Sequence, residues 1–201
     1  MTALPKPRAV DDADSLAELL DAATHEQRLR WVRSLGGRQQ RRLFELSRGR
    51  EVNVADLVRG DGEIVRYPGR NGLPVFSRFE KRLYRSGAEV CGYNHNPPLV
   101  RWVSGPGHFT VSDRAVPGEV TFDYRRIPSA HHPDVPPLTD NEHGLPALVF
   151  GDLVDVVRRV SRHVFVGDAT KGGEGRSAPR PWIVRIGALM PTAPFVVVQV
   201  P

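Results

Sequence analysis

The spacing of hydrophobic residues divides the chain into two parts that meet near residue 60. Between residues 12 and 60, apolar residues recur at the three- and four-residue spacing of amphipathic helices. After Gly60, β-branched and aromatic runs alternate with Gly, Pro, Asn and Asp, which is typical of strands and turns. We therefore predict a helical N-terminal segment over residues 1–60 and a β-rich domain over residues 61–201.

The first part carries start and stop signals for short helices. The signals predict helices that begin near Ser15, near Thr24 and at Arg38, and a last turn that begins at Asn53. In the first two helices, a Glu or Gln three residues after the first residue completes the spacing of a capping box. Isolated helices this short are marginal in water, so they must pack on one another or on the following domain.

The second part has the pattern of a series of strands. Val120, Phe122 and Tyr124 alternate with polar residues, so one face of their strand is expected to be buried. The candidate strands are residues 63–67, 75–84, 88–93, 99–103, 108–112, 119–124, 163–166, 181–186 and 195–200.

One late helix is expected among these strands. Apolar residues between Val149 and Val160 fall within about 100° of arc at helical spacing. Asp155 precedes Arg159 by four residues, which is the spacing of a helical ion pair. Residues 149–161 are therefore predicted to be helical. The resulting fold class is α+β: short N-terminal helices followed by a mainly antiparallel β-sheet or partly closed barrel with one late packed helix.

The composition narrows the class of protein. Hydrophobic residues at 40% and charged residues at 25% are the ordinary mix of a globular chain. The sequence contains neither an apolar run long enough to span a membrane nor the pattern of a signal peptide, so we expect a cytoplasmic protein without a membrane partner. The single cysteine, Cys91, excludes an internal disulfide and a zinc site built on several cysteines.

Candidate acid/base residues lie where a predicted strand meets a turn. Tyr93 and His95 belong to a segment that combines a thiol, a phenol, amides and an imidazole. His108 follows a glycine-rich turn, and Asp123 lies on the next predicted strand. Tyr93, His95, His108 and Asp123 are therefore candidate catalytic residues of a hydrolase or lyase. The alternative interpretation is ordinary turn chemistry beside a buried cysteine.

The sequence leaves the cofactor unknown. His131, His132 and Asp134 could ligate zinc, but their spacing matches no established metal motif, so a solvated loop is expected and no metal site is predicted. The glycine-rich loop at residues 171–176 lacks the Gly-Lys-Ser/Thr order of a phosphate-binding loop.

Positive charge is concentrated in the predicted helices. The chain has a formal net charge of +5, and residues 24–50 contain eight Arg against two Glu. An arginine-rich outer face is compatible with contacts to a phosphate backbone, although any amphipathic helix has a charged outer face. The candidate nucleic-acid-binding residues are Arg30, Arg33, Arg41 and Arg48.

Several short blocks resemble a group of uncharacterised bacterial proteins of similar length, to which no activity is assigned. The blocks are residues 69–76, Phe79-Glu80-Lys81-Arg82, Gly92-Tyr93-Asn94, residues 104–109 and residues 158–164. The resemblance implies a bacterial source and no particular activity.

Three functions are consistent with these patterns. We favour a binding or interaction module for an unknown small molecule or protein partner, because aromatic residues are plentiful and no residue group meets the geometric requirements of an enzyme. The alternatives are an enzyme that uses the Tyr/His/Asp group and nucleic-acid binding through the arginine-rich helices.

Overall fold

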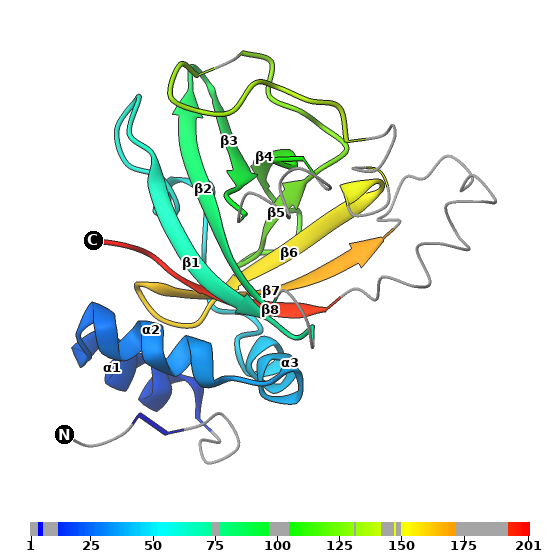
Figure 1. Ribbon diagram of the computed structural model, residues 1–201. Coiled ribbons are helices and arrows are strands. Elements are labelled where there is room, and N and C mark those ends of the chain that lie inside the picture. The colour runs from blue at the N-terminus through cyan, green and yellow to red at the C-terminus, as the bar shows by residue number, and fades with distance from the viewer. Residues whose placement is uncertain are drawn as a thin grey trace.

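Helices followed by a closed β-barrel make up the fold (Figure 1). The computed structural model of the chain describes residues 4–5, 12–73, 77–96, 105–130, 132–141, 147, 150–171 and 193–201. Three short α-helices precede eight antiparallel strands, and the last strand pairs with the first. The predicted α+β class is confirmed, and the sheet closes completely.

Each of the three helices is ten residues long: α1 is Ala13–Ala22, α2 is His25–Ser34 and α3 is Gly37–Leu46. The predicted capping box of α2 is confirmed, because the Thr24 amide donates to Gln27 Oε1 at 2.7 Å and the Gln27 amide donates to Thr24 Oγ1 at 3.3 Å. The predicted last turn is the 3₁₀ helix η2, Val54–Asp56, capped by Asn53. Among the described residues, no helix combines the length and apolar character needed to cross a membrane.

The predicted start of the first helix at Ser15 was wrong by one turn. Asp12 is the N-cap, since its carboxylate accepts from the amides of Asp14 and Ser15. The Ser15 hydroxyl also donates to Asp12, at 2.6 Å. A carboxylate favours the positive end of a helix and has two acceptor oxygens, so it outcompetes the serine as the cap.

The strands follow the chain in order around the barrel, each antiparallel to both neighbours. The predicted strands at 99–103 and 181–186 lie outside the described residues, and the others correspond to barrel strands with shifted ends. The strands are β1 Val65–Asn71, β2 Arg78–Ser86, β3 Glu89–Asn94, β4 His108–Asp113, β5 Val120–Asp123, β6 Leu153–Arg159, β7 Val164–Lys171 and β8 Pro194–Val198.

The late helix predicted over residues 149–161 was wrong for most of its length. Ala147 and Phe150 are helical, but residues 153–159 form β6, between β5 and β7. Valine loses side-chain freedom in a helix and packs well on a sheet, so the valine-rich run is a strand. The expected helical pair does not form, because Asp155 binds Lys81 and Arg159 binds Asp56.

The two ends of the barrel differ. At one end, the strands are joined by residues 72–77, 95–107, 124–152 and 172–193, and we call this the loop end. At the opposite end the connections are shorter, and Leu57 belongs to the hydrophobic core inside the barrel. The Tyr67 hydroxyl donates to the Leu57 carbonyl at 2.6 Å. Because the segment around η2 covers this second end, we call it the closed end.

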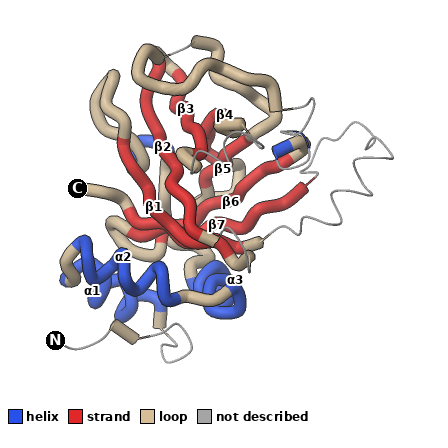
Figure 2. The backbone as a smooth tube through the Cα atoms, in the orientation of Figure 1, coloured by secondary structure: helices blue, strands red, loops and turns tan. Residues whose placement is uncertain are grey.

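The helices pack on the outside of the barrel, against β7 and β8 (Figure 2). In β8, Phe195 and Val197 point into the barrel, while Val196 and Val198 point outward to the helices. This arrangement explains why β8 is apolar throughout instead of alternating. The helical side of the interface is formed by Leu16, Leu20, Trp31, Val32, Leu35 and Leu43.

Arg158 of β6 ties α3 to the barrel. Its guanidinium donates twice to Glu119 Oε1, at 2.8 and 2.6 Å, and once to the Phe44 carbonyl at 2.8 Å. The guanidinium carbon also lies 3.9 Å from the centroid of the Phe44 ring. The planar fork of arginine satisfies all these contacts at once, which a lysine could not do.

We expect Gly167→Ala to destabilise the fold and to disturb the barrel interior. A Cβ at Gly167 would overlap the ring of Phe195, which therefore has to move. Overpacking of this kind costs about 1–3 kcal/mol of unfolding free energy, measurable by urea titration. Gly60→Ala is the control, since a Cβ there has open space, and its effect should stay within about 0.5 kcal/mol. Equal stability of the two variants would contradict the close approach.

Candidate functional site

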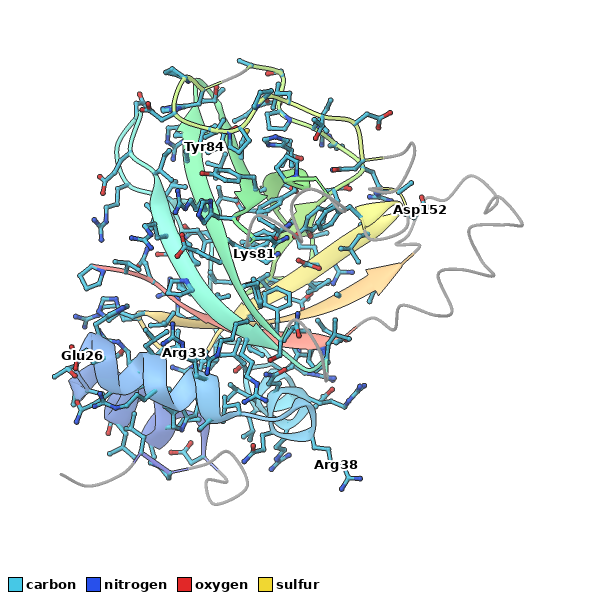
Figure 3. All side chains as sticks on the ribbon, in the orientation of Figure 1. Glu26, Arg33, Arg38, Lys81, Tyr84 and Asp152 are labelled. Carbon is cyan, nitrogen blue, oxygen red and sulfur yellow. The ribbon has the colours of Figure 1, made fainter. Side chains whose placement is uncertain are left out.

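Four polar side chains meet inside the barrel and form what we call the polar cluster: Lys81, Asn94, Tyr124 and Asp155. The ammonium nitrogen Nζ of Lys81 donates to Asp155 Oδ2 at 3.0 Å, to Asn94 Oδ1 at 3.2 Å and to the Tyr124 hydroxyl. Lys81 is 4% exposed and Asp155 is 2% exposed, so this is an ion pair removed from solvent. Figure 3 shows Lys81 between the strands, in the middle of the barrel.

The alternation of side chains along the strands places these residues inside. On β2, Phe79 and Leu83 pack in the interior core, and Lys81 lies between them on the same face. On β6, Asp155 likewise lies between Leu153 and Val157, which pack in that core. The cluster therefore occupies positions that would otherwise hold apolar residues.

The hydrogen bonds of the cluster form a closed network. The three hydrogens of the Lys81 ammonium have three acceptors, one each on Asn94, Tyr124 and Asp155. The Asn94 amide nitrogen donates to the Gly107 carbonyl and to the Tyr124 hydroxyl, both at 3.2 Å. The Tyr124 oxygen lies 3.4 Å from Asp155 Oδ2. Such a network is rigid when it is complete and costly to leave incomplete.

Aromatic rings surround the ammonium group. Its nitrogen lies between 4.9 and 5.6 Å from five ring centroids, a distance at which the ring faces attract a cation. The rings also offer apolar surface beside a charge. They belong to Phe79, Phe109, Phe122, Tyr124 and Phe195.

Burial shifts the protonation equilibria of the pair in opposite directions. Removal from water lowers the pKa of Lys81, against the opposing pull of the Asp155 carboxylate. The same burial raises the pKa of Asp155. It also raises the pKa of Tyr124, which stays a neutral phenol. The pKa values of the amine and the carboxyl therefore approach each other, and proton transfer between them costs less free energy than in water.

The position of the cluster favours a functional role. A buried ion pair is weak evidence for stability, because well-packed apolar residues often serve the fold as well or better. Asn94 is the last residue of β3, and Tyr124 directly follows β5, so both lie at the loop end. Polar groups with shifted pKa values near a barrel mouth are typical of binding and catalytic sites.

The predicted acid/base residues lie on the outward face of the barrel wall, away from the polar cluster, and Tyr93, His108 and Asp123 are buried there. Tyr93 and His108 face each other across β3 and β4 with ring centroids 6.0 Å apart, and His95 lies 6.4 Å from Tyr93. The ring nitrogen Nε2 of His108 lies 3.1 Å from the Pro137 carbonyl oxygen. Three of the four residues thus come together beneath a covering segment.

Asp123, the fourth predicted residue, has a separate partner. Its two carboxylate oxygens accept from the Arg125 guanidinium at 2.8 and 2.7 Å. Cys91, near Tyr93, is fully buried, and burial raises the pKa of its thiol to about 12. Cys91 is therefore a packing residue, since the reactive thiolate is scarce at neutral pH.

The predicted nucleic-acid-binding residues lie on the exposed surface of α2 and α3. Arg33 and Arg41 are exposed, as are Arg30 and Arg48. Arg30 is paired with Glu26 at 3.5 Å, and Arg48 with Glu45 at 3.2 Å. Arg28, which is one of the eight arginines in residues 24–50, is buried and donates to the carbonyls of Leu20 and Ala23.

The histidine-containing loop shows no ligand arrangement in its described part. His131 and most of the loop at 171–176 lie outside the described residues. His132 Nδ1 accepts from the Asp134 amide at 3.2 Å, and its ring lies 5.3 Å from that of Tyr84. Within the described residues, no three His, Cys, Asp or Glu side chains are grouped so that they could hold a metal ion.

Comparisons of the chain with protein-family models, with curated protein sequences and with solved structures find no match. Sequence reasoning missed Lys81, Asn94 and Asp155 as site residues. The available signal was a lysine between Phe79 and Leu83, at the position where an alternating strand should carry an apolar residue.

We expect Lys81→Met to destabilise the protein in a pH-dependent way. At neutral pH it leaves the Asp155 carboxylate buried without a cation, which costs about 3–5 kcal/mol of unfolding free energy. Burial raises the pKa of this carboxyl, and Lys81 opposes that rise in the wild type, so the folded variant binds the proton more tightly than the folded wild type does. The deficit should therefore shrink as pH falls below the folded-state pKa, by up to about 1.4 kcal/mol per pH unit.

Urea titrations between pH 7.5 and 5 measure this effect. The double variant Lys81→Met/Asp155→Leu is the control, because it removes both charges and should recover most of the lost stability at every pH. A Lys81→Met deficit that stays constant over this pH range would show that the carboxylate is not the cause.

Proposed function

We propose that the barrel is a small-molecule binding module whose ligand carries an apolar body and an oxygen acceptor, such as a carboxylate or a carbonyl group. The observation that supports this proposal is the buried Lys81 ammonium within the polar cluster. The ligand enters at the loop end, because the opposite end is covered by the segment around η2.

Binding proceeds by exchange of one acceptor. Asn94 Oδ1 lies 3.2 Å from Lys81 Nζ, which is farther than Asp155 Oδ2 at 3.0 Å. The Asn94 oxygen also carries no net charge. A ligand oxygen replaces the Asn94 oxygen, while Asp155 keeps its contact with the ammonium. An exchanged hydrogen bond nearly balances in free energy, and the surplus comes from a charge-assisted bond to an anionic ligand.

The aromatic rings define the rest of the ligand. Phe109 and Phe122 are stacked with centroids 5.0 Å apart, and the Tyr124 and Phe150 rings are stacked at 5.3 Å. Eight-stranded barrels are just wide enough for filling side chains or one small ligand. The ligand is therefore small and apolar apart from its acceptor group. A cationic group has no acceptor to offer the Lys81 ammonium, so it cannot replace the Asn94 oxygen.

We expect carboxylates to bind more tightly than amines of the same carbon skeleton. Isothermal titration calorimetry with aromatic and medium-chain carboxylates, each paired with its amine, measures the difference. Carboxylates should bind at least tenfold more tightly, which is about 1.4 kcal/mol. In the Lys81→Met/Asp155→Leu variant this preference should disappear. Equal affinity of the variant and the wild type for the carboxylates would refute the proposal.

A second candidate function, nucleic-acid binding, is favoured by exposed arginines of α2 and α3 that form no salt bridge with a described carboxylate. Arg33, Arg38 and Arg41 are exposed, and none of them forms an ion pair with a described carboxylate. Arg38 extends from α3 away from the barrel (Figure 3). Since the apolar sides of α2 and α3 are packed on the barrel, their guanidinium groups face solvent, where they can contact phosphates.

The four predicted arginines provide a matched test of this second function. Arg33→Gln/Arg41→Gln removes two charges that form no salt bridge with a described carboxylate, and Arg30→Gln/Arg48→Gln removes two charges that are paired with glutamates. Gln has nearly the helix propensity of Arg, so both variants should fold. Fluorescence anisotropy with single- and double-stranded oligonucleotides should show a larger loss of binding affinity for the first variant. The slope of its log binding constant against log salt concentration should fall by about 1 per lost phosphate contact. Equal losses would indicate an effect of net charge alone.

A further inference from the structure

The amine of Lys81 lies beside two groups that can transfer protons. Asp155 Oδ2 is 3.0 Å from Nζ, and the Tyr124 hydroxyl is hydrogen-bonded both to Nζ and, at 3.4 Å, to Asp155. A primary amine that attacks a carbonyl group needs such partners, because protons must leave the nitrogen and reach the oxygen.

We propose that Lys81 forms a reversible imine with an aldehyde or ketone bound inside the barrel. This inference rests on the proposed binding function and specifies the class of compound that the site accepts. The carbonyl oxygen takes the place of the Asn94 acceptor, which brings the carbonyl carbon next to Nζ.

The step is balanced with the residues present. The Lys81 ammonium first gives a proton to Asp155, and the free amine then adds to the carbonyl carbon, forming a C–N bond while the C=O π electrons move to oxygen. Tyr124 gives its proton to this oxygen and takes one from the nitrogen, which leaves a carbinolamine. Asp155 then protonates the hydroxyl group, the C–O bond breaks, water leaves, and the nitrogen lone pair forms the iminium.

The site suits the product as well as the reactants. The iminium keeps the positive charge of the ammonium, so the Asp155 carboxylate and the five aromatic rings stabilise it as they stabilise Lys81 now. Burial lowers the pKa of Lys81 and raises that of Asp155, which makes the first proton transfer easier. Exclusion of bulk water also slows hydrolysis of the imine.

Reductive trapping tests this inference on the wild-type chain, in which peptide mapping has only Lys6, Lys81, Lys171 and the N-terminus to distinguish. The protein is incubated with benzaldehyde and cyanoborohydride near pH 7, and the benzyl adducts are located by mass spectrometry. We expect Lys81 to be modified at least tenfold faster than the other amines. Modification confined to Lys6, Lys171 or the N-terminus would overturn the inference.

A pair of tyrosine variants tests the proton relay. Tyr124→Phe should slow trapping at Lys81 at least tenfold. Tyr67→Phe is the matched control, because it also removes a buried hydroxyl from the barrel interior, but at the closed end, and it should leave the trapping rate unchanged. Equal rates in the two variants would remove Tyr124 from the mechanism.

Reductive trapping tests the imine, and calorimetry with carboxylates tests the binding function, so the two proposals can fail separately. If carboxylates bind with the expected dependence on Lys81 but no adduct forms there, the imine is refuted and the binding module stands. If neither occurs, both proposals are refuted. A reduced adduct at Lys81 supports both.

Discussion

The ion pair between Lys81 and Asp155 sets the conditions for the rest of the barrel interior. It joins β2 to β6, strands that are not neighbours in the barrel, so it spans the interior instead of lying along one wall. Two charges removed from water require partners in fixed positions, and Asn94 and Tyr124 supply them. The rings of Phe79, Phe109, Phe122 and Phe195 lie around this pair. Packing and polar contacts thus constrain each other.

Closure of the sheet makes this arrangement possible. A closed barrel has no exposed strand edge, and its diameter follows from the number and tilt of its strands. The distance between Lys81 and Asp155 is therefore fixed by the whole ring of strands. The helices cover β7 and β8 on the outside, and the segment around η2 covers one end. A ligand of the cluster therefore has to enter at the loop end.

The sequence predicted local features well where a single pattern decided them. The capping box at Thr24 depends on residues three apart, and the alternation around Phe122 depends on neighbours along one strand. Residues 153–159 were misassigned because a run of valines satisfies the helical period, and the Asp155–Arg159 spacing resembles a helical pair. Tyr93 and His108 are opposite each other in the register of β3 and β4. Which face of the sheet they occupy depends on strand pairing, and pairing is a non-local property that one sequence does not reveal. The polar cluster shares this dependence, since its members come from four separate parts of the chain.

The double burial of β8 has a consequence for biosynthesis. Its inward side chains complete the barrel core, its outward valines complete the surface on which the helices pack, and its pairing with β1 closes the ring. Until β8 has left the ribosome, the helices lack much of their packing surface. The sheet is then not closed, and Lys81 and Asp155 are exposed to water. Folding therefore waits for translation of the final strand, and the nascent chain exposes apolar helices and unpaired edges that a chaperone can shield.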